Sequence, residues 1–291
     1  MNLREKLNIY LELTKIRITS FVTLTTVFGF VVASQSINSK IILPTLGVLL
    51  LACGAAVINH IQERETDKLM DRTKNRPLPS RKICLKETII LSLILLIVGS
   101  ILISLTAGLI ALGLGLLNLI WYNVIYTPLK KKTAFAIIPG SLVGAIPPAI
   151  GWVAGGGSLS DPRIAFISFF FFIWQIPHFW LLLFMFGKDY ESAGLPTLTK
   201  IFNFDQLGRI TFVWIITTII ICLSLPMFGV VKSSYINFGL LLSGFWLTWN
   251  TLKLLRPNIE LKQFKFAFYN INLFVILVVF LISIDNLFIL Y

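Results

Sequence analysis

The sequence predicts an all-α, polytopic integral membrane protein with nine transmembrane helices, folded as a single domain over residues 1–291. Three observations predict this fold class. The composition is 56% hydrophobic and 13% charged, with a mean hydropathy of +0.86, which is more apolar than a soluble domain can bury. The apolar residues form repeated stretches of about 20 residues, the length of a helix that crosses a bilayer. The basic residues gather in alternate connecting segments, as in membrane proteins.

Each predicted span is a run of apolar residues between charged segments or Gly/Pro-rich breaks. The stretch 1–17 is charged and amphipathic, unlike a removable signal peptide, so we expect the first span to remain in the mature protein. In chain order the spans are 18–34, 41–61, 88–105, 109–126, 135–154, 164–186, 210–230, 236–254 and 266–284. The segments that separate them, in the same order, are 35–40, 62–87, 106–108, 127–134, 155–163, 187–209, 231–235 and 255–265.

The distribution of the 25 Lys and Arg residues predicts the orientation. With the N-terminus inside, all of them except Lys40, Arg163 and Lys232 belong to inner segments. The positive-inside rule then gives a cytoplasmic N-terminus, in what we expect to be a bacterial inner membrane. Most acidic residues also belong to inner segments, so we expect the active site at the cytoplasmic side.

The positions of the basic residues and of the cysteines argue against nucleic-acid binding and against disulfide or thiolate metal sites. A formal charge of +12 would point to nucleic acid in a soluble protein, but membrane topology explains these basic residues, so we expect no nucleic-acid partner. The three cysteines are scattered without a CxxC pair, which indicates neither a disulfide framework nor a thiolate metal site.

The most informative segment begins at the inner end of the second span. Asn59, Glu63, Asp67 and Asp71 recur every four residues, so they share one face if the helix continues beyond the membrane. Like charges at this spacing weaken a helix, which indicates a bound cation. Carboxylate oxygens prefer a hard ion, and Mg2+ is typically held by one or two carboxylates together with substrate phosphates. The segment therefore predicts a magnesium and diphosphate site.

A second stripe with the same period lies about 100° around this helix. It consists of His60, Arg64, Lys68 and Arg72, whose cations could bind phosphate oxygens. The alternative is a solvated helix end whose charges neutralise one another. Because Asn59 lies inside a membrane span, where polar groups are costly, we favour the functional interpretation.

These residues carry a resemblance to a known family. The spacing of Asn59, Glu63, Asp67 and Asp71, followed by the segment 72–78 with Arg-Thr-x-x-Arg-Pro-Leu, resembles the first aspartate-rich motif of the UbiA prenyltransferase superfamily. The form of the motif is that of its protoheme farnesyltransferase branch. The family pattern more often has Asp where this chain has Glu63, a longer side chain with the same charge.

Two later segments extend the resemblance over most of the chain. Residues 126–133, followed by the Gly- and Pro-containing segment 140–152, are similar to the family's link between the fourth and fifth spans. Residues 174–179, Trp-Gln-x-Pro-His-Phe, resemble the heme branch. Quinone-type relatives usually carry a second Asp-x3-Asp pair after this segment, whereas here Asp189 is followed by Ala193.

The resemblance implies a UbiA-type bundle that transfers the farnesyl group of farnesyl diphosphate to a vinyl group of heme b (protoheme IX), giving heme O and diphosphate with Mg2+ as cofactor. It also implies delivery of the product to a heme A synthase or a terminal oxidase. The residues expected to bind metal are Glu63, Asp67, Asp71 and Asp189, with Asp67, Asp71 and Asn59 as catalytic residues. The residues expected to bind substrate are Arg64, Lys68, Arg72, Arg76, Lys130, Gln175, His178 and Tyr190.

Some alternatives stay open at this point. The chain could prenylate an aromatic quinone precursor such as 4-hydroxybenzoate or a naphthoate, although the incomplete second motif at Asp189 disfavours it. A transporter is a remoter alternative, since transporters place charges near the bilayer midplane rather than at one face. His178 could face heme iron, a propionate or the diphosphate, or could be a packed histidine with no ligand.

Overall fold

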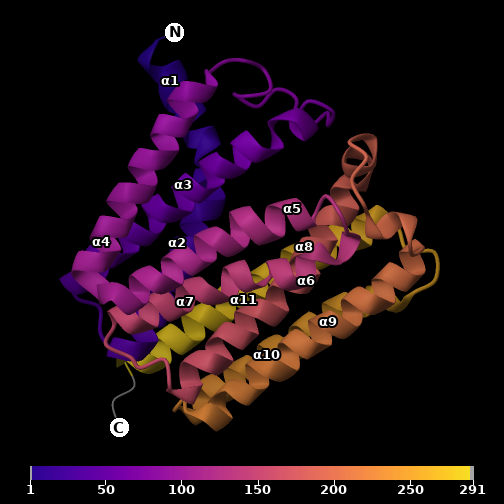
Figure 1. Ribbon diagram of the computed structural model, residues 1–291. Coiled ribbons are helices and arrows are strands. Elements are labelled where there is room, and N and C mark those ends of the chain that lie inside the picture. Colours follow the sequence, from indigo (N-terminus) through magenta and orange to yellow (C-terminus); the bar gives the residue numbers. More distant parts are fainter. Residues whose placement is uncertain (1, 289–291) are drawn as a thin grey trace.

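The computed structural model describes residues 2–288, which form helices joined by short connections, without a strand in that range (Figure 1). The long helices are α2 (Ile16–Ser34), α3 (Ile42–Asp67), α4 (Leu85–Ile120), α7 (Leu142–Ala154), α8 (Pro162–Ser192), α9 (Phe204–Ser224), α10 (Ser234–Thr251) and α11 (Leu261–Phe288). The shorter ones are α1 (Leu3–Leu13), α5 (Thr127–Leu129), α6 (Ile137–Gly140), the π-helix Trp121–Tyr126 and the 3-10 turns Ser39–Ile41, Ala134–Ala136, Leu198–Lys200, Leu225–Phe228 and Leu252–Leu255.

The prediction of nine membrane spans is confirmed for the described residues. Seven helical runs are long and apolar enough to cross a bilayer by length and composition. One of these runs, Leu85–Leu129, contains two predicted spans, because the chain turns at Gly108 with a φ of 82° and a ψ of 177°. Glycine has no side chain to clash in this conformation. The eighteen-residue α10 supplies the remaining span.

The outer surface of the bundle is apolar. Among the large hydrophobic side chains, Leu105, Phe245 and Trp249 are 79%, 71% and 75% exposed. A soluble monomer would not present so many such side chains to water. In an integral multi-pass membrane protein they face lipid, so the outer surface agrees with the composition of the sequence.

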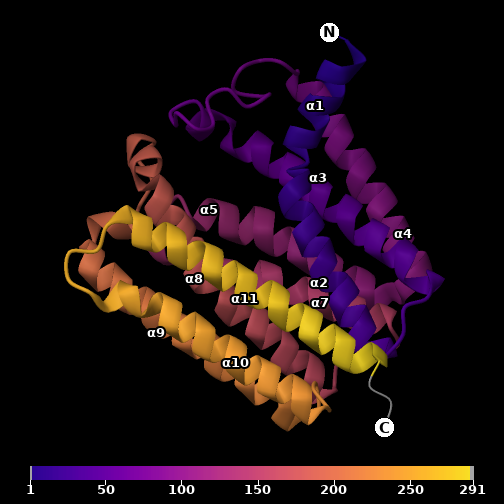
Figure 2. The ribbon, with the colours of Figure 1, turned by 180° about the vertical axis from the view of Figure 1, so that it is seen from behind.

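Helix α11 links the first helices of the chain to the last ones. In Figure 2, α11 runs across the molecule beside α2 on one side and α9 on the other. Its contacts confirm this position, because α11 packs against α2, α8, α9 and α10. Elsewhere in the bundle α3 packs along α4, and α2 packs along α7.

Small residues allow α2 and α7 to approach closely. A methyl group on Gly29 would collide with the backbone carbonyl of Pro148, and one on Gly151 would collide with that of Thr26. Membrane helices associate through such close backbone contacts, because lipid supplies no hydrophobic driving force between them. Thus α7 is held inside the bundle, with most of its residues buried.

The segments that carry the predicted motifs lie at one end of the bundle. Helix α1, the connection 68–84 after α3 and the C-terminal end of α8 all lie toward the upper end in Figure 1. The connection after α5 turns back into the bundle near the same end. These four segments, which are far apart in the sequence, therefore lie near one another in the fold.

Candidate active site

The C-terminal end of α3 carries a buried row of polar side chains. Asn59, Glu63 and Asp67 are only 1%, 6% and 0% exposed. Their spacing of four residues keeps them on one face of the helix, and this face lines a cavity inside the bundle. Buried polar groups of this kind are stable only with partners, and all three have partners in the structure.

Asp67 is bound by Arg76, which the chain reaches after a series of turns. One guanidinium nitrogen of Arg76 donates to both carboxylate oxygens of Asp67, at 3.0 and 2.9 Å. The turns are fixed locally, because the Thr73 hydroxyl donates to the Asp67 backbone carbonyl at 2.9 Å and the Arg76 amide donates to the Thr73 carbonyl. Pro77 follows Arg76 and cannot continue a helix.

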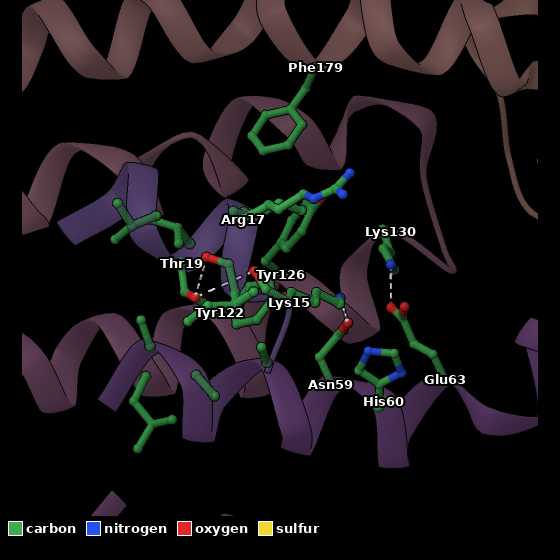
Figure 3. A pocket seen from close by; sticks show the side chains of 18 of the residues that line it. Lys15, Arg17, Thr19, Asn59, His60, Glu63, Tyr122, Tyr126, Lys130 and Phe179 are labelled. Carbon is green, nitrogen blue, oxygen red and sulfur yellow. Dashed lines mark hydrogen bonds and ion pairs between the residues drawn. The ribbon is translucent and has the colours of Figure 1, made fainter. Parts of the chain in front are cut away.

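Glu63 forms an ion pair with Lys130, which comes from the other side of the cavity (Figure 3). Lys130 follows the π-helix Trp121–Tyr126, which carries the Tyr122 and Tyr126 rings into the same space. Burial alone would favour the neutral amine of Lys130, but the attraction of the Glu63 carboxylate outweighs it and raises the pKa of Lys130. Lys130 is therefore a permanent cation at neutral pH.

Lys15 is a third cation at this site, and sequence reasoning missed it. Its ammonium donates to the Asn59 amide oxygen at 2.6 Å, while the Asn59 amide nitrogen donates to Thr127 at 3.2 Å. Lys15 joins α1 to α2 with a left-handed φ of 48°. Burial of the amine end lowers the pKa of Lys15 to about 8. In the sequence it is one of four basic residues before the first span, without any feature that distinguishes it.

These side chains line one end of a cavity of about 780 Å³ (Figure 3). The charged end is formed by Lys15, Glu63, Asp67, Arg76 and Lys130, with Arg72 and Tyr190 beside them. The other end is apolar and lies deeper along α3 and its neighbours. Its wall includes Val48, Leu51, Ala52, Ala55, Gly115, Leu119 and Ile150. The cavity thus offers a compact anion site joined to a slot for a hydrocarbon chain.

Three residues of the predicted motif lie outside this cavity. Helix α3 ends at Asp67, so the expectation of a helical stripe that continues to Asp71 is wrong. The Asp71 side chain is 86% exposed and pairs with Lys74 at 2.6 Å, which lowers the pKa of Asp71. Arg64 and Lys68 face away from the cavity and pair with the exposed Glu65.

The fourth member of the basic stripe, Arg72, does reach the cavity. Its guanidinium stacks over the ring of Phe186 on α8 at 4.6 Å. The stripe therefore divides, with His60 and Arg72 at the cavity and the two residues between them outside. Because the chain leaves the helix at Asp67, the position of Arg72 follows from the turn and not from helical periodicity.

Helix α8 contributes some of the residues predicted from its motif. Gln175 and Tyr190 line the cavity, and the Gln175 side chain lies so close to Gly144 that a methyl group there would collide with it. His178 is not part of the cavity wall, and its Nδ1 hydrogen bonds to Asn272 of α11 at 2.7 Å. Asp189 is half-buried and does not line the cavity either.

The UbiA prenyltransferase family matches residues 22–272 of this chain. The chain belongs to the UbiA prenyltransferase family. Among the curated relatives, a protoheme IX farnesyltransferase from Oleidesulfovibrio alaskensis is 32% identical over 80% of this chain and 82% of the relative. A protein of the same name from Legionella pneumophila is 34% identical over 93% of this chain and 94% of the relative. This UbiA-family protein is therefore a prenyltransferase.

Solved structures agree with the fold of this UbiA-family protein. A structure of digeranylgeranylglyceryl phosphate synthase has a TM-score of 0.79 and 19% identity, covering 98% of this chain and 100% of the other. A UbiA homolog from Archaeoglobus fulgidus bound to GPP and Mg2+ has a TM-score of 0.66 and 16% identity, covering 94% and 99%. At these identities the likeness confirms the fold.

The donor groups of this UbiA-family protein fit Mg2+ only together with a substrate. Within residues 2–288 no cluster of three or more His, Cys, Asp and Glu side chains could hold a metal ion by itself. Glu63 and Asp67, one turn apart on α3, are buried carboxylates at the cavity. One or two carboxylates completed by phosphate oxygens and water make up a common Mg2+ site in enzymes that act on phosphates.

Proposed function

We propose that this UbiA-family protein transfers the farnesyl group of farnesyl diphosphate to a vinyl group of protoheme IX, forming heme O with release of diphosphate. The observation that carries the proposal is the cavity itself, in which buried cations and carboxylates occupy one end and apolar side chains the other. Such a cavity suits a substrate with an anionic head and a hydrocarbon tail. The names of the relatives support the acceptor, since the similar curated proteins are protoheme IX farnesyltransferases.

In this proposal the diphosphate lies between Lys15, Arg76 and Lys130. Before the substrate binds, Arg76 and Lys130 are paired with Asp67 and Glu63, so the cations are already positioned. When bound, Mg2+ would be held by Glu63, Asp67 and the diphosphate, and would neutralise the charge that develops on the leaving group. The cations supply the same kind of stabilisation from fixed positions.

The apolar end receives the farnesyl chain and keeps water from the reacting carbon. The bond between C1 and the diphosphate oxygen breaks with its electron pair on oxygen, and the vinyl π electrons form the new carbon–carbon bond. Water then adds to the resulting cation on the vinyl carbon, losing a proton to give the hydroxyethylfarnesyl group. Water that reached C1 earlier would divert the reaction to farnesol, so the wall around Leu51, Leu119 and Ile150 protects it.

The predicted roles of Asp71, Asp189 and His178 stay predictions. Asp71 and Asp189 lie outside the cavity wall, and a metal role for either requires a change in the connection 68–84 or the inner end of α8 when substrate binds. These two segments already touch, because the Ser192 hydroxyl donates to the Leu69 carbonyl at 3.2 Å.

The test is an assay with purified protein, farnesyl diphosphate and heme b, with and without Mg2+. We expect prenylated heme of the mass of heme O, diphosphate release, and loss of both when Mg2+ is removed by a chelator. A parallel assay replaces heme by 4-hydroxybenzoate or a dihydroxynaphthoate. Prenylation of the aromatic acid and not of heme would contradict the proposed acceptor and support the quinone alternative.

We also propose that the charged end faces the cytoplasm of a bacterial cell and that the product passes to a heme A synthase or a terminal oxidase. The support for this orientation is the concentration of basic residues at the same end as the cavity's charged groups. Reporters fused after Lys132 and after Lys200 should be cytoplasmic, and one fused at Gly156 external. An external reporter after Lys132 would overturn the orientation.

A further inference from the structure

The two histidines of this chain have contrasting surroundings. His178 has a polar partner, because its Nδ1 contacts the Asn272 amide oxygen at 2.7 Å. The amide nitrogen of Asn272 donates to the Phe268 carbonyl, so its oxygen is the group that faces the histidine. The His178 ring packs against Trp174 and Phe268 and does not line the cavity.

His60 is a cavity residue without a polar partner. It is 1% exposed, it lines the cavity, and neither ring nitrogen makes a hydrogen bond. Buried polar atoms are costly to leave unpaired, and an exception in a binding cavity points to a ligand that pairs with them.

The position of His60 is at the junction of the two ends of the cavity. It follows Asn59 on α3, at the end of the polar row that is nearest to the small residues Ala56 and Ala52 of the apolar end. Figure 3 shows its ring beside Asn59 and Glu63, on the same side of the helix. Asp67, seven residues further on, points in nearly the same direction about 10 Å along the axis. A ligand of His60 would therefore adjoin the proposed diphosphate site.

The two unpaired ring nitrogens of His60 can each take a partner from a ligand in the cavity. A neutral ring offers one lone pair and one N–H group. Mg2+ prefers oxygen ligands, whereas heme iron commonly takes imidazole nitrogen as an axial ligand. We propose that a ring nitrogen of His60 binds the iron of the heme substrate, which places a vinyl group beside the charged end. This inference rests on the proposed function and identifies how the acceptor is held.

A hydrogen bond from His60 to the diphosphate is the competing role. The two roles predict different losses of affinity when His60 is replaced. If His60 binds iron, its replacement changes the spectrum and affinity of heme and leaves farnesyl diphosphate binding intact. If it serves the diphosphate, the reverse holds. His178→Ala is the comparison that separates the two histidines, because the sequence also predicts a substrate role for His178, whereas its ring contacts Asn272 and does not line the cavity.

The experiment titrates ferric heme b into purified full-length protein and records the Soret and visible bands. We expect a histidine-ligated spectrum for the unmodified protein and for His178→Ala. His60→Ala and His60→Gln should lose this spectrum and bind heme about tenfold more weakly or worse. Added imidazole should restore the spectrum in His60→Ala, because it can occupy the space of the missing ring.

A non-reactive farnesyl diphosphate analogue checks that the variants fold, since its affinity should not change in His60→Gln. The inference is overturned if His60→Gln keeps the histidine spectrum, if His178→Ala loses it, or if analogue affinity falls with the heme spectrum intact. An unmodified protein that binds no heme at all would contradict the proposed function itself. That result is distinguishable, because it appears before any substitution is made.

Discussion

The acidic motif divides into two regions that look alike in the sequence and differ in the structure. Glu63 and Asp67 are buried, line the cavity and pair with cations from distant segments. Asp71, four residues further along, is exposed and pairs with its neighbour Lys74. A carboxylate at the right spacing is thus a candidate site residue only as far as the helix continues.

The two regions differ in where the partners of the charged side chains come from. On the cavity side, each carboxylate of α3 has a partner brought by a different segment, Arg76 by the turn after the helix and Lys130 by the π-helix. On the outer side, Arg64 and Lys68 share the neighbouring Glu65. Exposed pairs of this kind contribute little, because water and salt screen them.

The largest expected effect is that of Asp67→Asn. The substitution removes a buried negative charge, leaves Arg76 without its partner, and eliminates a proposed magnesium ligand. We expect turnover to fall by about a hundredfold to a thousandfold. Asp71→Asn is the matched control, and there we expect activity within about twofold of the unmodified protein. Equal losses in both variants would restore Asp71 to the metal site and remove the division of the motif.

Lys130→Met should have the next largest effect. The methionine keeps much of the side-chain volume but leaves Glu63 unpaired and the diphosphate without a fixed cation. We expect the affinity for a non-reactive farnesyl diphosphate analogue to fall by about tenfold to a hundredfold. Lys132→Met, at an exposed position of the same basic cluster, should leave that affinity unchanged. A similar loss in both would show that general surface charge, and not the cavity, attracts the substrate.

Lys15 gives a prediction for pH. Its pKa of about 8 lies below the usual 10.5, so in the substrate-free protein the amine loses its charge as the pH rises through about 8. Analogue affinity should fall over that range, and Lys15→Arg should remove the decline because Arg stays charged. For folding stability the sign is opposite, because burial of the charged amine is costly at low pH, and this cost shrinks as the pH rises from about 8 to 10.5, where the unfolded chain still holds the proton. Affinities for the analogue, measured at several pH values for the unmodified protein and for Lys15→Arg, test this prediction. The same decline in both would contradict it.

The smallest effects are expected at Arg64 and Lys68. Both pair with Glu65 on the outer side, and they border a shallow surface depression rather than the cavity. Arg64→Gln and Lys68→Gln should each change turnover by less than about twofold. Arg76→Gln, which removes a cation on the cavity side, is the comparison. If Arg64→Gln impaired the enzyme as much as Arg76→Gln, both regions of the motif would bind substrate.

The sequence by itself determined the class of protein and the outline of its fold. Repeated apolar stretches predict membrane helices because the bilayer core requires about 20 residues to cross it. Even the break at Gly108 was visible, because small residues interrupt the apolar run there. Five residues that the motifs single out line one cavity, and their roles there stay predictions: Asn59, Glu63, Asp67, Arg76 and Lys130. The single domain over 1–291 stays a prediction.

The tertiary structure decided which polar residues meet. The four-residue period could not show that α3 ends at Asp67, because turns fixed by Thr73 and Arg76 compete with the helix there. It could not find Lys15, whose place at the cavity depends on a left-handed residue between two helices. Nor could it distinguish the two histidines, since a hydrogen bond to Asn272 joins α8 to α11 across a large separation in sequence. Local spacing is set by one helix, whereas partners are set by how helices pack.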